Sequence, residues 1–314
     1  MITRVTTFAP ASISNLGSGF DVLGVAIDKP GDRVIAKRKR EPGLIFSVTS
    51  SGGEVPLSAK QNVAAHVASL MIKEFNVSFG IEMTLHKRMP IGSGLGSSAA
   101  SSVAAAVAVN ALLPKPLPKC ELLRFAVEGE RMASGSPHAD NAAPSLLGGV
   151  CLIRSYEPLD MIQLPVQRSL IWVVVHPHVI IRTEEARSIL PKTVSMRNAV
   201  HQWGNVSGLT AGLIAGNALL AGKCVEDVIV EPVRARLIPA FEEVKHAALR
   251  NGATGCSISG SGPSMFAIAP SLKQAAVIGK AMQGVFTKKA RVQSELYISR
   301  TNMTGATILS QGKE

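Results

Sequence analysis

The chain of 314 residues is long enough to bury a large core and to form two domains. Hydrophobic residues make up 46% and charged residues 18%, which excludes an intrinsically disordered chain. The net charge of +11 is compatible with nucleic acid, an anionic surface or an acidic small substrate, but an aromatic content of 4% argues against stacking platforms for single-stranded nucleic acid.

The first half of the chain alternates predicted strands and helices. Alternating hydrophobic residues between turn residues predict strands at residues 2–8, 21–27, 33–38, 44–48, 81–87 and 148–154. Apolar residues at helical spacing predict helices at residues 62–75, 97–112 and 119–133. Residues 134–137 are expected to form a turn, and the proline-bearing stretch 157–166 a linker.

The second half shows a different order of elements. Strands are predicted at residues 170–176, 254–259, 264–269 and 290–299, and helices at residues 184–190, 195–221, 239–251 and 272–285. This pattern indicates antiparallel strands backed by helices. We therefore expect an α+β protein with an N-terminal domain of residues 1–160 and a C-terminal domain of residues 161–314.

Cysteine usage and the N-terminus bear on the cellular compartment. Cys120, Cys151, Cys224 and Cys256 lie far apart and form no Cys-x-x-Cys pair, which favours a reducing compartment over disulfides or a zinc site. The N-terminus lacks the long apolar stretch of a signal peptide, and the apolar run 99–113 is shorter than a membrane span. We expect a cytoplasmic protein without a membrane partner.

A charge-free run from Pro90 to Ala100 joins a predicted strand to a predicted helix. Its three alternating glycines let the backbone turn tightly and approach a ligand, and the helix N-terminus offers unpaired N–H groups to an anion. The run is not a P-loop, because no lysine follows the glycines, and Ser97 stands where a dinucleotide fingerprint needs glycine. A phosphate cradle and an ordinary turn before a buried helix both remain open.

Three further segments combine polar and small residues. Residues 9–21 contain Asn15 and end at Asp21, and they form either a hairpin loop or a ligand-binding loop. Residues 129–144 bring carboxylate, imidazole and amide groups together. A carboxylate with serine hydroxyls suits Mg²⁺. The alternative to a functional site is that each of these residues is merely solvated or caps a helix. Residues 252–264 hold a second glycine-rich loop, and Arg187 and Arg234 suit a carboxylate or phosphate.

These segments together resemble the GHMP family of small-molecule kinases over residues 9–266, and within it the branch that phosphorylates homoserine. The glycine loop and Gly260-Ser261-Gly262-Pro263-Ser264 carry the resemblance to the family. Asn15-Leu16-Gly17 with Gly19-Phe20-Asp21, Ser134-Gly135 with His138 and Asp140-Asn141, and Glu231-Pro232-Val233-Arg234 carry the resemblance to the branch. The resemblance implies a left-handed βαβ unit in the first domain, a ferredoxin-like second domain, and a homodimer.

The resemblance also implies that ATP with Mg²⁺ phosphorylates the side-chain hydroxyl of L-homoserine, a step toward threonine. It implies that ATP is held by Pro90, Ile91, Gly92, Ser93, Gly94, Leu95, Gly96, Ser97, Ser98, Ala99 and Ala100, and Mg²⁺ by Ser98 and Glu130. The amino acid would be bound by Asn15, Asp21, His138, Asp140, Asn141, Arg187 and Arg234. On charge grounds, Asp21 suits the ammonium, and Arg187 and Arg234 suit the carboxylate.

Catalysis is expected to involve Asn141, Asp140, Glu130 and Ser98. Either Asp140 acts as a base, or Asn141 holds the hydroxyl in a base-free transfer; phosphoryl transfer depends mainly on alignment and charge stabilisation, which favours the second route. Other GHMP kinases of the mevalonate or cytidyl-diphosphate-methylerythritol type are the alternative within the family. A basic nucleic-acid-binding protein is the alternative from a different class, and the basic run Lys37–Arg40 has no assigned role.

Overall fold

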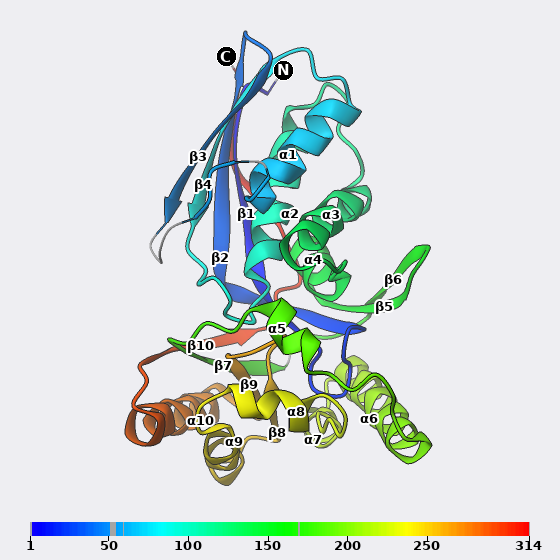
Figure 1. Cartoon of the computed structure of the whole chain (residues 1–314), viewed down its shortest axis with the longest axis vertical. Helices are drawn as coiled ribbons and strands as arrows, with labels where there is room; N and C mark the ends of the chain where they lie inside the picture. Colours follow the sequence, from blue (N-terminus) through cyan, green and yellow to red (C-terminus); the bar gives the residue numbers. More distant parts are fainter. Residues whose placement is uncertain (1, 51–54, 59, 169, 314) are drawn as a thin grey trace.

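The computed structural model describes residues 2–50, 55–58, 60–168 and 170–313. Two α+β domains lie one above the other, each a sheet with helices packed on it, and both chain termini lie at the far end of the first domain (Figure 1). The expected α+β class is confirmed.

The first domain is built on a seven-stranded sheet. Its main path runs in the order β11-β1-β2-β4-β3, and a hairpin of β5 and β6 joins through the pairing of β5 with β2. The bounds are β1 Arg4–Ser14, β2 Leu23–Lys39, β3 Gly43–Ser50, β4 Gly80–Lys87, β5 Val150–Tyr156, β6 Leu159–Leu164 and β11 Thr307–Gly312. Strands β3 and β4 are parallel and are connected through α1 (Val63–Glu74), which makes a βαβ unit.

One face of this sheet is covered by helices with α2 (Ser97–Leu112) at their centre. Every residue of α2 except Ser98 is buried, because its alanines and serines let α1, α3 (Leu123–Ser134), α4 (Ala139–Leu147) and the sheet approach closely. The N-terminus of this buried helix is therefore fixed in place, and it points toward the second domain (Figure 1).

The second domain holds a four-stranded antiparallel sheet in the order β10-β7-β9-β8. Its strands are β7 Ile171–Pro177, β8 Gly255–Ile258, β9 Met265–Ala269 and β10 Ser294–Arg300, and its helices are α5 Thr183–Ser188, α6 Met196–Ala215, α7 Ala218–Lys223, α8 Glu231–Arg234, α9 Phe241–Arg250 and α10 Leu272–Val285. A strand, a helical segment, two strands, a helix and a last strand follow one another, which is the ferredoxin-like order.

Several elements differ from the sequence predictions. The stretch predicted as a linker contains β6, which pairs with β5, and the two strands predicted at 21–27 and 33–38 form the single strand β2. The helix predicted at 195–221 is divided after Ala215, because Gly216 takes a left-handed φ of 63° and Asn217 caps α7 through its side chain. The expected division into residues 1–160 and 161–314 also does not follow the sheets, because β11 hydrogen-bonds to β1.

Helix α4 had no counterpart in the prediction. Helix α4 contains Pro144, a residue that argues against a helix in a sequence analysis, and it places Asp140 and Asn141 in its first turn. Within the described residues, no helix is both long and apolar enough to cross a bilayer.

Candidate active site

A cavity of about 1040 Å³ lies where the loops of the two domains meet. The first domain contributes the glycine loop, the loop after β1, the end of α3 and the start of α4. The second domain contributes the segment before and through α5, together with Arg234 and the loop that contains Gly260. The wall from the first domain therefore consists of loops that present mainly backbone groups, and the wall from the second domain carries arginines.

The glycine loop is held by contacts that leave no space for side chains. Gly94 has a φ of 74°, and a Cβ atom placed there would lie 2.3 Å from the carbonyl oxygen of Ser259. The Ser259 hydroxyl donates to the Gly94 carbonyl at 2.7 Å, and the Ser264 amide donates to the Ser93 carbonyl at 3.2 Å. The two glycine-rich loops seen in the sequence thus fix each other across the domain boundary.

The loop ends at the N-terminus of α2, which offers free hydrogen-bond donors. Gly96 is the N-cap residue and provides no side-chain cap, so the first N–H groups of the helix lack an intrahelical partner. The hydroxyls of Ser93 and Ser97 are buried and have no hydrogen-bond partner among the residues that the structure describes. Together with the positive end of the helix dipole, these groups form a cradle that fits the oxygens of a phosphate.

Lys87, which the sequence analysis did not identify, lies beneath this cradle. Its ammonium donates to the Asp32 carboxylate, to the Ser97 carbonyl at 2.7 Å and to the Ser101 hydroxyl at 2.9 Å. Asp32 in turn accepts from two backbone amides at the end of β4. This buried ion pair ties the end of β4 to the first turn of α2, and so it holds both ends of the glycine loop.

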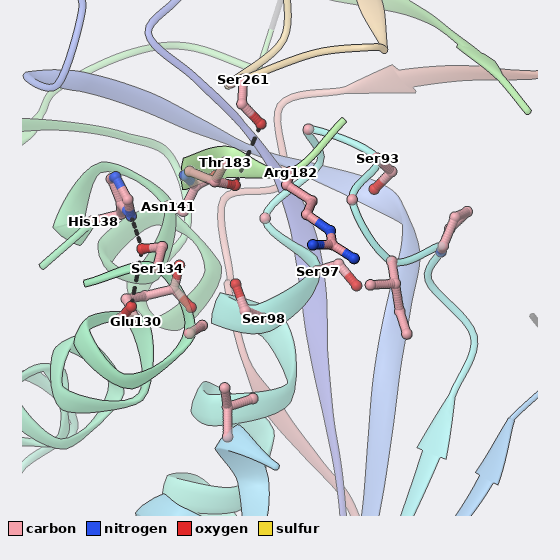
Figure 2. A pocket seen from close by; sticks show the side chains of 18 of the residues that line it. Ser93, Ser97, Ser98, Glu130, Ser134, His138, Asn141, Arg182, Thr183 and Ser261 are labelled. Carbon is pink, nitrogen blue, oxygen red and sulfur yellow. Dashed lines mark hydrogen bonds between the residues drawn. The ribbon is translucent and has the colours of Figure 1, made fainter. Parts of the chain in front are cut away.

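Ser98 and Glu130 provide the oxygen donors of a candidate metal site (Figure 2). Oε1 of Glu130 is buried and has no hydrogen-bond partner in the described part of the chain. Burial raises the pKa of Glu130 to about 7, against smaller opposing effects of the Ser98 hydroxyl and the Lys87 ammonium. A buried carboxylate oxygen that lacks a partner, beside a hydroxyl and a phosphate cradle, fits a hard cation such as Mg²⁺. No group of three or more His, Cys, Asp or Glu side chains converges within the described residues, so phosphate oxygens or water would complete the coordination.

Asn141 lies between β1 and the glycine loop. Its side-chain oxygen accepts from the Ser12 hydroxyl at 2.9 Å, and its side-chain nitrogen donates to the Ser14 hydroxyl at 2.9 Å. A Cβ atom on Gly96 would lie 2.8 Å from this amide oxygen, so the Asn141 amide is adjacent to the phosphate cradle. The neighbouring Asp140 is 1% exposed. Burial, followed by the charges of Asp21 and Glu130, raises the pKa of Asp140 to about 8.

At the other end of the cavity, Asp21 and Arg187 form an ion pair between the domains. Nη2 of Arg187 donates to both carboxylate oxygens of Asp21, at 2.8 and 2.9 Å, and to Nε2 of His138 at 3.0 Å. Because a guanidinium cannot accept, Nε2 is the unprotonated nitrogen of His138, and Nδ1 donates to the Ser134 hydroxyl. Burial and the Arg187 charge lower the pKa of His138 to about 4, so this imidazole is neutral.

Arg234 is a buried cation without a carboxylate. It is 3% exposed, and it donates to the carbonyls of Ala186 and Gly260 at 3.0 and 3.1 Å. Within the described part of the chain, Arg234 forms no ion pair. The centre of the Phe20 ring lies 5.1 Å from the guanidinium carbon of Arg234 and 5.5 Å from that of Arg187, so one aromatic ring lies next to both cations. An anion that enters this end of the cavity would meet two guanidinium groups.

The structure brings together nearly all residues that the sequence analysis selected. Asn15 is a positioning residue as well as a lining one, because its amide accepts from the Asp21 backbone N–H at 3.0 Å and donates to the Gly260 carbonyl at 2.8 Å. The other lining residues are Asp21, Pro90 to Gly94, Gly96 to Ser98, Glu130, His138, Asp140, Asn141, Arg187 and Arg234. Leu95, Ala99 and Ala100 have their side chains in the hydrophobic core, so their predicted part in ATP binding would rest on backbone groups.

Two further residues were not among the predicted site residues. Arg182 lines the cavity, and Figure 2 shows its side chain extending toward Ser97, on the phosphate side. Gln202 of α6 donates to the Ser18 carbonyl and to Asp227, both at 3.0 Å, and so it holds the loop that carries Asp21. Gln202 has no local sequence signal, because its role depends on contacts between distant segments.

Comparison with protein families assigns the class. Residues 62–149 match the GHMP kinases N-terminal domain, and residues 209–288 match the GHMP kinases C-terminal domain. The chain, with its glycine loop at a helix N-terminus between two α+β domains, is a GHMP kinase.

Curated relatives narrow the class. The chain is 48% identical to a homoserine kinase of Chlorobium phaeobacteroides, over 97% of this chain and 99% of that protein. It is 40% identical to the homoserine kinase of Arabidopsis thaliana, over 99% of this chain and 86% of that protein. The crystal structure of a homoserine kinase from Cytophaga hutchinsonii superposes with a TM-score of 0.94 at 46% identity, covering 98% of both chains. The chain belongs to the homoserine kinase family.

Proposed function

We propose that this protein transfers the γ-phosphoryl group of ATP to the side-chain hydroxyl of L-homoserine, which yields O-phospho-L-homoserine on the route to threonine. The observation that carries the proposal is one cavity with two chemically different ends. One end is a phosphate cradle, and the other offers Asp21 to an ammonium and two arginines to a carboxylate. A hydroxyl between these ends would face the terminal phosphate.

The amino-acid end argues against the other substrates of this fold. An L. major mevalonate kinase superposes with a TM-score of 0.72 at 18% identity, which shows the fold alone. Mevalonate has a carboxylate but no ammonium, so Asp21 would have no cationic group of the substrate to bind. An amino acid uses both Asp21 and the arginines, and therefore it fits better.

Mg²⁺ would be held by Ser98 and Glu130 together with phosphate oxygens. When bound, the ion neutralises negative charge on the phosphates. The protein's own groups then have two tasks. The N–H groups of α2 and the serine hydroxyls align the triphosphate, and the Asn141 amide, fixed by Ser12 and Ser14, orients the acceptor hydroxyl.

We propose that the transfer needs no protein base. Burial holds Asp140 protonated near neutral pH in the free protein, and a protonated carboxyl cannot accept the hydroxyl proton. An Asp140→Asn variant should retain kcat within roughly tenfold, because a general base contributes about 10²- to 10⁴-fold. A loss of several orders of magnitude in kcat with an unchanged KM for homoserine would show that Asp140 is the base.

The reaction is tested by coupled ADP release with homoserine, with mevalonate and without an acceptor, and by ³¹P NMR of the product. We expect MgATP-dependent turnover with homoserine only. Absence of turnover with homoserine at saturating MgATP would contradict the proposal, and salt-sensitive binding to nucleic acid without turnover would favour the alternative class. The cytoplasm is the proposed compartment, since Cys120, Cys151, Cys224 and Cys256 are all free thiols.

A further inference from the structure

Arg182 is an exposed cation on the wall of the cavity, at the N-cap position of α5. Its guanidinium forms no hydrogen bond or ion pair within the part of the chain that the structure describes, although Glu184 lies two positions further along and lines the same cavity. Figure 2 shows the side chain pointing across the cavity toward Ser97. An arginine that points into a cavity with its donors unused is available to an anionic ligand.

Contacts on both sides fix the backbone of Arg182 against the glycine loop. The preceding residue, Ile181, is 4% exposed, and its N–H donates to the Gly92 carbonyl at 3.4 Å. A Cβ atom on Gly92 would lie 2.9 Å from the segment before Arg182, so this approach requires a glycine. The hydroxyl of the following residue, Thr183, forms a hydrogen bond of 3.4 Å with the Ser261 hydroxyl. The second domain therefore presents Arg182 to the cradle from a fixed position.

The wall opposite Arg182 offers neutral donors to a ligand. The hydroxyls of Ser93 and Ser97 are buried, and no described residue bonds to them. The Lys87 ammonium beneath the cradle already has three acceptors, and the Asp32 carboxylate among them balances its charge. A triphosphate in this cradle would bring several negative charges, so a cation on the facing wall would stabilise it.

We propose that Arg182 binds the terminal phosphate of ATP from the second domain and stabilises the charge that develops during the transfer. The inference rests on the proposed function, because it needs ATP in the cradle. In that reaction the bond between the γ-phosphorus and the β,γ-bridging oxygen breaks, and the acceptor oxygen bonds to the γ-phosphorus. The hydroxyl proton passes to an oxygen of the transferred group. Negative charge collects on the phosphate oxygens meanwhile, and a planar guanidinium can bind two of them at once.

The place of Arg182 along the cavity favours the terminal phosphate over the inner ones. Ser97, toward which Arg182 points, directly precedes Ser98, whose hydroxyl forms the candidate metal site with Glu130. The Asn141 amide, which would orient the acceptor hydroxyl, is adjacent to the same end of α2. The triphosphate must end here to reach the acceptor. Arg182 therefore lies where the phosphoryl group would leave ATP.

Nucleotide binding measured by calorimetry tests the contact itself. The β,γ-imido analogue of ATP, and ADP, are each titrated with Mg²⁺ into the wild-type chain and its variants. Arg182→Gln should weaken binding of the imido analogue by roughly tenfold and that of ADP by about twofold or less, because only the analogue has a third phosphate. Arg236→Gln is the matched control and should bind both nucleotides like the wild type. Arg236 is also an exposed arginine of the second domain, and it is not among the described residues that line the cavity.

Steady-state kinetics with chemical rescue separate a catalytic contact from a structural one. Arg182→Gln should lower kcat by roughly 10²-fold and leave the KM for homoserine unchanged, because the contact strengthens as charge develops on the phosphate. In Arg182→Ala, millimolar guanidinium chloride should restore part of the lost kcat, since the free ion can enter the vacated place; Arg236→Ala should show no such gain. Arg182→Lys should recover less than the full rate, because an ammonium lacks the planar fork. The melting temperature should stay at the wild-type value in all these variants.

Three results would overturn this inference alone. The first is a wild-type chain that turns over MgATP and homoserine while Arg182→Gln has the same kcat and the same affinity for the imido analogue. The second is equal weakening of the analogue and of ADP, which would place Arg182 at an inner phosphate. The third is a raised KM for homoserine with an unchanged kcat, which would assign Arg182 to the amino acid. A wild-type chain that binds no MgATP would overturn the proposed function as well.

Discussion

Substitution of Lys87 by methionine tests whether the buried ion pair beneath the glycine loop supports both the fold and nucleotide binding. The change keeps the length of the side chain but removes the ammonium. Asp32, which is fully buried, would lose its cation. The Ser97 carbonyl and the Ser101 hydroxyl would lose their donor as well.

The expected loss of stability is large because the pair is buried. The side chains of Lys87 and Asp32 are 6% and 0% exposed, and breaking a buried pair by removing one partner costs about 3–5 kcal/mol. An unfolding entropy of about 2.1 cal/mol/K per residue over 314 residues corresponds to about 1.5 °C per kcal/mol, so the melting temperature should fall by roughly 5–8 °C. Because Lys87 also holds Ser97 at the start of α2, the KM for ATP should rise while the KM for homoserine changes less.

Differential scanning calorimetry and the coupled ADP assay measure the two effects. Lys39→Met is the matched control, because Lys39 forms an exposed pair with Glu82 whose contribution should stay below about 1 kcal/mol. A Lys87→Met/Asp32→Asn double variant removes the unpaired charge and should recover a large part of the stability. The reasoning is refuted if Lys87→Met melts within the range of Lys39→Met and keeps its KM for ATP.

Three further changes have distinct expected results. Gly94→Ala should lower kcat/KM for ATP by more than tenfold, because its Cβ would clash with Ser259. Gly135 is the control: it has the same φ of 74°, and an added Cβ there would have no atom within 4 Å. Gly135→Ala should therefore lose stability but keep nucleotide binding. Asp21→Asn should raise the KM for homoserine by roughly ten- to hundredfold and leave the KM for ATP unchanged. Asp28 forms an exposed ion pair with Arg168, and Asp28→Asn should change neither KM. Burial lowers the pKa of His176 to about 4, so below pH 6.5 the unfolded chain binds more protons than the folded one. Thermal stability should therefore fall as the pH decreases from about 6.5 to about 4. His176→Gln should reduce the slope of stability against pH, and an unchanged slope would contradict the role given to His176.

The sequence alone could predict the segments whose role depends on backbone geometry. Three alternating glycines before an alanine-rich helix predicted a tight turn that a ligand could approach, and all three glycines take a positive φ, which favours glycine. Lys87 was missed although a signal exists. Ile81, Met83 and Leu85 alternate inward on β4, and Lys87 continues the same inward register. A lysine at the end of a strand is usually solvated, and the sequence alone does not show that Asp32 lies beside Lys87.

Elements defined by distant contacts could not be predicted. Strand β11 has mostly exposed residues and little hydrophobic alternation, and it forms a strand because β1 offers it an edge. The same reason applies to β6, which is ordered by its pairing with β5. Gln202 and the Asp21–Arg187 pair join residues separated by more than 150 positions along the chain, which a single sequence does not reveal.

The charges at the amino-acid end explain why a zwitterion, more than a simple acid, fits this cavity. In the free protein Asp21 neutralises Arg187, and the hydrogen bonds of Arg234 within the described residues go to carbonyl groups. Burial lowers the pKa of Arg234 to about 10, which shows that its charge is poorly solvated. A carboxylate that enters would stabilise Arg234 and compete with Asp21 for Arg187. An ammonium on the same ligand then supplies Asp21 with a new cation, so that no buried charge is left unpaired. A ligand that has only one of the two charges would break the Asp21–Arg187 pair without replacing it.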